Sequence, residues 1–307
     1  MNSPLLPPPR TLTLRDGRQL AFACYGASDG RPVHVLHGFP GSRWQAALLD
    51  GAARASGVCL VAADRPGFGA SSPQPGRHIA GFADDLAQLA DHLGHRCFAV
   101  LGISCGGPYA LACAQWLPDR VERVGLLAGI GPMDVPALRH GQLPMLRLMF
   151  ALARLNPLLT TPLLQVDRLL FRRDPQRALK ALAALLTPPD QRLLASDPAL
   201  RDLFAASLAE AYRPGIAGAR CEVGLIARPH GIALESIQQP VDIYQSGQDR
   251  HVPPAMGRHL AQRLANARLH ACPEEGHLSV VVHCGPAFLR DHAASAAQAT
   301  LSASSVG

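Results

Sequence analysis

Residues 100–107 read Val100-Leu101-Gly102-Ile103-Ser104-Cys105-Gly106-Gly107, which contains a G-x-S-x-G pattern. The run before it, Phe98 to Leu101, is short and apolar, as expected of a buried parallel strand. Helix formers follow from Tyr109 to Trp116. Glycine is needed two residues before and after the serine, because a Cβ there would collide with the neighbouring chain. The pattern therefore predicts a nucleophile elbow, a tight strand-to-helix turn with the hydroxyl of Ser104 projecting from its tip.

Strands alternate with helices on both sides of this turn, which predicts an α/β fold with a mostly parallel sheet and helices on both of its faces. An N-terminal hairpin around Asp16-Gly17 joins Thr11–Leu14 to Leu20–Tyr25. Ser42 is the expected N-cap of a helix. The other expected strands are Val33–Leu36, Val58–Ala63, Phe98–Leu101, Val121–Ala128, Val241–Gln245 and Ala267–Ala271.

The alternation divides the chain into segments. Residues 11–130 and 240–294 form the predicted core, and its last helix ends near Ala294. Residues 131–239 carry helical patterns broken by prolines, with no convincing strand, and are predicted to be an inserted helical cap. Residues 1–10 and 295–307 are predicted to be a flexible lead and a flexible tail.

Composition argues against several classes of protein. The 307 residues are 48% hydrophobic, enough for a substantial core, and the net charge is +6. No run of adjacent basic residues is longer than Arg172-Arg173, so dispersed surface charge is expected rather than a nucleic-acid site. The most apolar window, Leu143–Leu159, is interrupted by prolines and arginines, so no membrane span is expected.

The eight cysteines form no C-x-x-C pair, and most lie in apolar segments where cysteine acts as a small buried hydrophobe. This usage predicts a reducing, cytoplasmic environment rather than a disulfide framework. The first ten residues lack the basic and apolar regions of a signal peptide. No dinucleotide or phosphate-loop fingerprint occurs in context, and no set of metal ligands stands out, so neither a cofactor nor a metal is expected.

A serine hydroxyl becomes nucleophilic when a histidine takes its proton and a carboxylate orients that histidine. In such a fold the acid and then the histidine follow later strands of the sheet. Asp249 lies in the loop after Val241–Gln245 and is the candidate acid, and His277 lies in the loop after Ala267–Ala271 and is the candidate base. The rival acids are Asp134, Glu274 and Glu275.

The oxyanion formed by attack on a carbonyl needs hydrogen-bond donors that are fixed in advance. The backbone N–H of Cys105, the residue after the candidate nucleophile, is one expected donor. The backbone N–H of Phe39, in the loop after Val33–Leu36, is the other. Cys105 itself is not the expected nucleophile, because the turn is centred on Ser104.

The chain resembles the α/β-hydrolase fold enzymes over nearly the whole predicted core. The resemblance is carried by five stretches: His37-Gly38-Phe39-Pro40-Gly41-Ser42, Asp64-Arg65-Pro66-Gly67-Phe68-Gly69, Gly102-Ile103-Ser104-Cys105-Gly106-Gly107, Gly247-Gln248-Asp249 and Gly276-His277. It implies a Ser104–His277–Asp249 triad and an oxyanion hole formed by the Phe39 and Cys105 amides. Epoxide hydrolases and haloalkane dehalogenases of this fold carry aspartate at the elbow, and the serine here argues against both.

These features predict a serine hydrolase, an esterase that acts on a carboxylic ester with a small apolar acyl group. Two alternatives stay open: hydrolysis or lysis of a carbon–carbon bond by the same triad, and a signalling protein that binds a ligand in a hydrolase-like pocket. A small-molecule substrate is the expected partner, and homo-oligomerisation is left open. The cap residues Leu146, Leu148, Met149, Phe150, Leu152 and Leu155 either line an acyl pocket or pack between cap helices.

Overall fold

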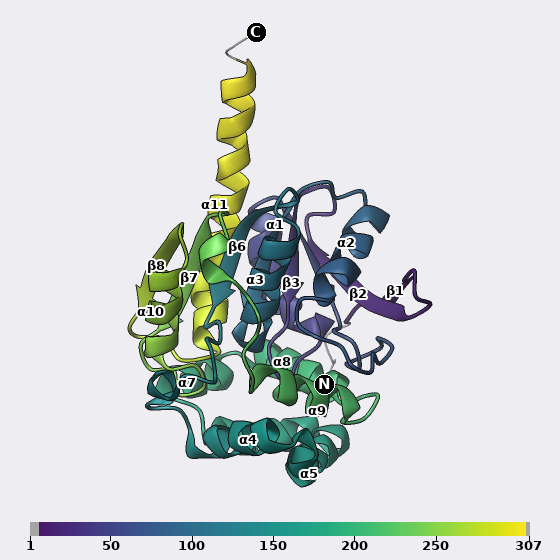
Figure 1. The fold of residues 1–307 in the computed structure, drawn as a ribbon, viewed down its shortest axis with the longest axis vertical. Helices are drawn as coiled ribbons and strands as arrows, with labels where there is room; N and C mark the ends of the chain where they lie inside the picture. Colours follow the sequence, from purple (N-terminus) through teal and green to yellow (C-terminus); the bar gives the residue numbers. More distant parts are fainter. Residues whose placement is uncertain (1–5, 305–307) are drawn as a thin grey trace.

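The computed structural model describes residues 6–304, and side chains as far as residue 295. These residues form an eight-stranded sheet flanked by helices (Figure 1). The strand order is β1-β2-β4-β3-β5-β6-β7-β8. The strands are β1 (Arg10–Thr13), β2 (Gln19–Gly26), β3 (Arg31–Leu36), β4 (Val58–Ala63), β5 (Phe98–Ile103), β6 (Val121–Leu127), β7 (Val241–Ser246) and β8 (Ala267–Cys272).

The sheet is parallel from β4 to β8 in the spatial order, and antiparallel only where β2 pairs with β4 and with β1. All residues of the central strands β4 and β5 are buried, which explains why both read as continuous apolar runs in the sequence. Because the carboxyl ends of parallel strands meet at one edge, the loops after β3, β5, β7 and β8 gather at that edge.

Helices cover both faces of the sheet. α1 (Asp50–Ala55) and α11 (Ser279–Ser304) pack on one face, where Leu49, Phe288 and Leu289 belong to one buried cluster. α3 (Gly107–Trp116) and α10 (Pro254–Arg263) pack on the other, and α2 (Phe82–His92) packs against α3. The prediction of a mostly parallel sheet with helices on both faces is confirmed.

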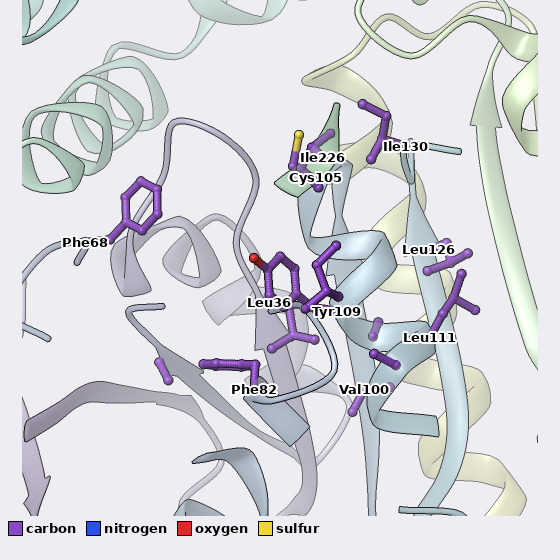
Figure 2. Close-up of a cluster of buried hydrophobic side chains, with 14 of the residues drawn as sticks. Leu36, Phe68, Phe82, Val100, Cys105, Tyr109, Leu111, Leu126, Ile130 and Ile226 are labelled. Carbon is purple, nitrogen blue, oxygen red and sulfur yellow. The ribbon is translucent and has the colours of Figure 1, made fainter. Parts of the chain in front are cut away.

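The apolar cluster on the α3 face is drawn in Figure 2. The Tyr109 ring is fully buried there and meets the Phe82 ring edge to face, with ring centroids 5.8 Å apart. The same cluster contains Cys105 from the turn after β5 and Ile226 from a helix far along the chain (Figure 2). The sheet therefore shares one continuous core with residues 131–239, the helical insert.

The helical insert contains six α-helices and no strand over its fully described length. They are α4 (Pro144–Leu155), α5 (Thr161–Arg173), α6 (Pro175–Ala183), α7 (Pro188–Ser196), α8 (Pro198–Ala211) and α9 (Ala217–Ile226). Proline stands in the first turn of the five helices α4 to α8, where its missing N–H has no helical partner to lose. The prolines that interrupt this part of the sequence are therefore helix starts.

Two sequence-based expectations differ from the structure. The segment after Ser42 begins as the 3₁₀ helix η1 (Arg43–Leu49), although Ser42 caps it as expected by accepting from the Trp44 N–H at 3.4 Å. The last core helix also runs further than predicted, because α11 continues to Ser304 rather than ending near Ala294. Residues 295–304 are rich in alanine, the best helix former, which explains the extension. The remaining tail, 305–307, and residues 1–5 lie outside the described residues.

The six apolar residues singled out in α4 do not act as one set. Met149 and Phe150 are buried in the shared core. Leu148 and Leu155 are 60% and 78% exposed, so they line no enclosed pocket. All eight cysteines, each within the described residues, are free thiols. None of the described helices is both long and apolar enough to cross a membrane.

Two buried ionic clusters tie the helical insert to the core. Glu222 of α9 forms an ion pair with Arg65, with an N–O distance of 2.7 Å. It also accepts hydrogen bonds from Arg77 at 2.6 Å and from the Tyr109 hydroxyl at 2.7 Å. Burial acts to raise the pKa of Glu222, but the two guanidinium groups outweigh burial and hold that pKa below its usual value. The second cluster joins Glu210 of α8 to Arg43 at 2.8 Å.

We expect Glu222→Gln to lower the free energy of unfolding by about 3–5 kcal/mol, because it leaves two buried guanidinium groups without their counter-charge. Urea denaturation followed by circular dichroism measures the change. Glu122→Gln is the control: Glu122 pairs with Arg31 at 2.8 Å but is 40% exposed, so its loss should cost under about 1 kcal/mol. Equal effects of the two substitutions would contradict a structural role for the Glu222 cluster.

Candidate active site

Ser104 is the first residue of the 3₁₀ helix η2 (Ser104–Gly106) and follows β5 directly, in the strand-to-helix turn that the sequence predicts. Its φ angle is 53°, a left-handed conformation that non-glycine residues rarely adopt. An added Cβ at Gly102 would lie 2.8 Å from the Gly106 carbonyl oxygen, and one at Gly106 would collide with the Leu36 carbonyl oxygen. Glycine at both positions is therefore a steric requirement of this turn, and the strained serine makes the turn a candidate functional site.

The loop after β3 runs directly beside this turn. An added Cβ at Gly38 would lie 3.4 Å from the Ser104 Cβ. The Gly38 N–H donates to Gln45 at 2.6 Å, and the buried Arg65 side chain donates to the carbonyl oxygens of His37 and Gly38. The buried side chains of Gln45 and Arg65 thus fix the backbone of this loop through its N–H and carbonyl groups.

The two amides expected to face an oxyanion belong to these two segments. In the part of the chain that the structure describes, the Phe39 N–H donates no hydrogen bond to protein. The Cys105 N–H lies at the start of η2, where helical N–H groups lack partners within the helix. The Cys105 thiol is fully buried, which raises its pKa to about 12, so it stays protonated and is not an activated nucleophile.

Asp249 and His277 are brought together. The Asp249 Oδ2 lies 2.7 Å from the His277 Nδ1. The Asp249 Oδ1 accepts from the N–H groups of His251 at 2.7 Å and Val252 at 2.9 Å, so the carboxylate is fixed by its own loop. Burial lowers the pKa of His277, but the charge and hydrogen bond of Asp249, with a contribution from Asp190, outweigh it and raise that pKa above its usual value.

The three rival acids lie elsewhere. Asp134 lines a cavity of about 350 Å³ together with His230 and His259, and the lining of this cavity does not include His277. Glu275 pairs with His283 at 3.0 Å, and Glu274 is exposed on the surface. Asp249 is therefore the carboxylate that orients His277 in this structure.

Among the described residues, no hydrogen bond joins the Ser104 hydroxyl to His277. Nucleophile-to-base hydrogen bonds are often long in unliganded enzymes and tighten when substrate binds. The His251 ring stacks on the His277 ring with centroids 4.7 Å apart. Burial lowers the pKa of His251 to about 4, so this neighbour is neutral near pH 7 and does not compete as a charged group.

Asp249, His251 and His277 are the one group in the described residues whose ligand atoms could approach a common metal ion. Their geometry does not favour coordination. The two imidazole planes are inclined by only 22° and stacked, so their in-plane lone pairs do not converge on one point. The Nδ1 of His277 is also already used by Asp249.

Sequence reasoning missed three side chains that hold the site in place. Gln45 and Arg65 fix the loop after β3, and Asp190 of α7 accepts from the backbone of His277. Arg65 was marked only as part of the Asp64–Gly69 motif. No local signal identifies Asp190, because its partners lie 87 to 89 residues further along the chain.

Comparisons with known proteins agree with this architecture. A family profile described as alpha/beta hydrolase fold matches residues 31–283. The pimeloyl-[acyl-carrier protein] methyl ester esterase of Aromatoleum aromaticum is 30% identical over 71% of this chain and 80% of its own length. The putative carbamate hydrolase RutD of Caulobacter sp. (strain K31) is 27% identical over 82% of this chain and 90% of its own length.

Among solved structures, an alpha/beta hydrolase fold protein from Nakamurella multipartita superposes with a TM-score of 0.68 at 23% identity, covering 94% of this chain and 98% of that one. This likeness concerns the fold alone. The chain spans half or less of the length of the first three curated relatives that it matches. The family profile covers most of the chain, and the protein therefore belongs to the α/β-hydrolase fold family.

The geometry predicts that Asp249→Asn will reduce kcat by about 10⁴, measured on whichever nitrophenyl ester the wild type hydrolyses. Asparagine can keep the two loop N–H bonds with its oxygen, but its NH₂ then faces the His277 Nδ1 and forces the wrong tautomer. Asp134→Asn is the matched control and should stay near the wild-type kcat. The reverse outcome, an inactive Asp134→Asn and an active Asp249→Asn, would place the acid after β6.

Proposed function

We propose that the protein is a serine hydrolase of carboxylic esters that carry a small apolar acyl group. The observation that carries the proposal is the placement of Ser104, in its left-handed turn, at the same sheet edge as the Asp249–His277 pair. A nucleophile, an oriented base and two backbone donors at one edge are the parts that acyl transfer requires. A relative named as a methyl ester esterase adds support for esters as substrates.

In the proposed reaction, the Ser104 Oγ attacks the ester carbonyl carbon while the Nε2 of His277 accepts the hydroxyl proton. The carbonyl oxygen becomes an oxyanion that accepts hydrogen bonds from the N–H groups of Phe39 and Cys105. Asp249 holds the Nδ1 proton of His277 and stabilises the imidazolium. His277 then donates its proton to the leaving alkoxide, and the acyl group stays on Ser104.

Water completes the cycle. His277 removes a proton from a water molecule, whose oxygen attacks the acyl carbon. The bond between that carbon and the Ser104 Oγ then breaks, His277 returns the proton to Oγ, and the acid leaves. No cofactor is consumed in either half. Of the two alternative functions, a carbon–carbon bond hydrolase would use the same catalytic groups with a carbon leaving group. A ligand-binding signalling protein would bind its ligand in this pocket without turning it over.

The helical insert is the proposed lid over this edge. Several contacts join it to the loops around the site. Among them, Ser42 donates to the Ser207 carbonyl at 3.1 Å, Gly218 packs on the Gly67 backbone, and Asp190 accepts from the His277 loop. An enclosing lid would exclude water and supply the wall of an acyl pocket.

A fluorophosphonate should label the folded protein on Ser104, because His277 makes that hydroxyl nucleophilic. Peptide mapping by mass spectrometry locates the adduct, and Ser104→Ala should abolish it. Labelled protein that hydrolyses no nitrophenyl ester would favour another leaving group or a binding role over ester hydrolysis. An adduct on a different serine would refute the assignment of Ser104.

A further inference from the structure

Exposed apolar side chains gather on one part of the helical insert. Eleven large hydrophobic residues are exposed in the described part of the chain, and nine of them lie between Met145 and Leu185. Leu155 is 78% exposed and Leu169 is 61% exposed. Large apolar residues are normally exposed singly, and a concentrated set marks an interaction surface.

Eight of these nine side chains belong to α4, to α5 and to the 3₁₀ helix η4 (Pro157–Thr160) between them, and Leu185 follows α6. Leu148 and Leu155 are seven residues apart on one face of α4, whereas Met149 and Phe150 point into the core. Figure 1 shows α4 and α5 at the end of the molecule opposite the tip of α11, away from the sheet. We call this apolar surface the outer insert face.

The same segment has a net positive charge almost as large as that of the whole chain. Residues 144–185 contain six arginines and one lysine against two aspartates, a net charge of +5 where the whole chain has +6. Of the two aspartates, Asp167 accepts from the Tyr212 hydroxyl at 3.2 Å and Asp174 caps α6. The outer insert face is therefore apolar and flanked by basic side chains.

We propose that the outer insert face binds the surface of an anionic lipid bilayer. Apolar side chains beside arginine and lysine are the pattern of helices that lie in a membrane interface, with the bases on lipid phosphates and the leucines among the acyl chains. Charge argues against a second copy of this chain as the occupant, because two copies of residues 144–185, each of net charge +5, would repel each other. The protein would thus bind peripherally, at its lid.

Vesicle flotation tests this proposal. The wild type should float with vesicles of phosphatidylcholine and phosphatidylglycerol in equal parts, should not float with phosphatidylcholine alone, and should be released by high salt. The double variant Leu155→Asp/Leu169→Asp should bind at least about tenfold more weakly. Trp116→Asp is the matched control, because Trp116 is 59% exposed outside this segment, and it should bind like the wild type.

Analytical ultracentrifugation of the same proteins without lipid tests whether a second copy of the chain binds this face instead. One outcome is that the wild type does not bind anionic vesicles and instead forms a dimer that the double variant does not form. That result would overturn the proposal and assign the face to self-association. Wild-type binding that the double variant retains would overturn it too, as would the absence of both vesicle binding and a dimer.

A second, independent observation concerns the backbone of the candidate base. One carboxylate of the helical insert, Asp190 of α7, accepts three successive backbone N–H groups: from His277 at 2.8 Å, Leu278 at 2.9 Å and Ser279 at 2.8 Å. α11 begins at Ser279, so the N–H groups of Leu278 and Ser279 lie at the helix start, where N–H groups lack partners within the helix. The insert therefore caps the core helix that follows the base.

The Asp190 carboxylate lies close to the backbone of residues 276–279 and is shielded from solvent. Asp190 is 1% exposed. An added Cβ at Gly276 would lie 2.5 Å from the Asp190 carboxyl carbon, so glycine is required before His277. On the core side, the Ser246 hydroxyl donates to the Gly276 carbonyl at 2.6 Å. The His277 ring is thus held by Asp249, and its backbone by Asp190.

We infer that Asp190 is a positioning residue for His277, an inference that rests on the proposed function. A carboxylate of the helical insert thus sets the position of the His277 backbone by direct contact. The charged or titratable groups around His277 are Asp249, Arg250 and His251 from the loop after β7, and Asp190 from α7. Loss of the Asp190 charge should therefore lower the pKa of His277.

The rate of fluorophosphonate labelling of Ser104 reads out this effect without depending on the choice of ester. Asp190→Asn should slow labelling by about tenfold or more, because small misplacements of a base are costly. The rise of the labelling rate with pH should move to lower pH, following the lowered pKa of His277. Glu210→Gln is the control: it weakens an insert–core contact that does not touch the His277 loop, and it should leave both quantities unchanged.

If Asp190→Asn does not fold, Gly276→Ala replaces it, since the added methyl group displaces the carboxylate from the three N–H groups. Its labelling should be slowed to a similar extent. Two results would show that Asp190 is only a structural contact. One is a folded Asp190→Asn variant with the labelling rate and pH profile of the wild type, and the other is equal slowing of labelling in Glu210→Gln. A wild type unlabelled on Ser104 would instead overturn the proposed function, and this inference with it.

Discussion

The architecture depends on the close packing of backbone around the turn after β5. Gly102 meets the backbone of Gly106 and Gly107, and Gly106 meets the carbonyl of Leu36 at the end of the neighbouring strand. This close packing allows the chain to turn from strand to helix at a single residue, Ser104. The turn requires Ser104 to adopt a strained left-handed backbone conformation. The turn projects the hydroxyl at the sheet edge where the other loops converge.

The helical insert is not a loosely attached addition to this frame. Its carboxylates Asp190, Glu210 and Glu222 each reach a different loop at the sheet edge. Removing one partner of a buried charge pair costs more than the pair contributes, so these contacts fix where the insert sits. Arg65 links the two parts of the site most directly, because it binds Glu222 of the insert and the backbone oxygens of His37 and Gly38.

Much of the frame was predictable from the sequence because its signals are local. Val58–Ala63 reads as a buried strand and is one, to the residue, because both of its faces are covered. Asp249 and His277 could be paired because each follows a strand of one parallel sheet, although Asp134 could not be excluded before the cavity that it lines was known. The end of α11 was missed because alanine-rich polar sequence reads equally as helix or as tail.

What the sequence could not supply are contacts between distant segments. Arg65 and Glu222 are both charged residues that a sequence reading places on the surface, yet each is fully buried against the other. Asp190 reads as an ordinary first-turn acid of α7, and only the folded chain reveals that it caps a different helix. The outer insert face escaped notice because periodicity alone does not distinguish an apolar face that packs inward from one left exposed.

The central claim, that Ser104, His277 and the two backbone amides form one acyl-transfer site, is tested most directly by a crystal structure of a phosphonate adduct. The account predicts phosphorus bonded to the Ser104 Oγ, with one phosphonate oxygen 2.7–3.1 Å from the N–H nitrogens of Phe39 and Cys105. It also predicts the Nε2 of His277 within hydrogen-bond distance of the adduct. Phosphorus on another residue, or a phosphonate oxygen directed away from both amides, would contradict it.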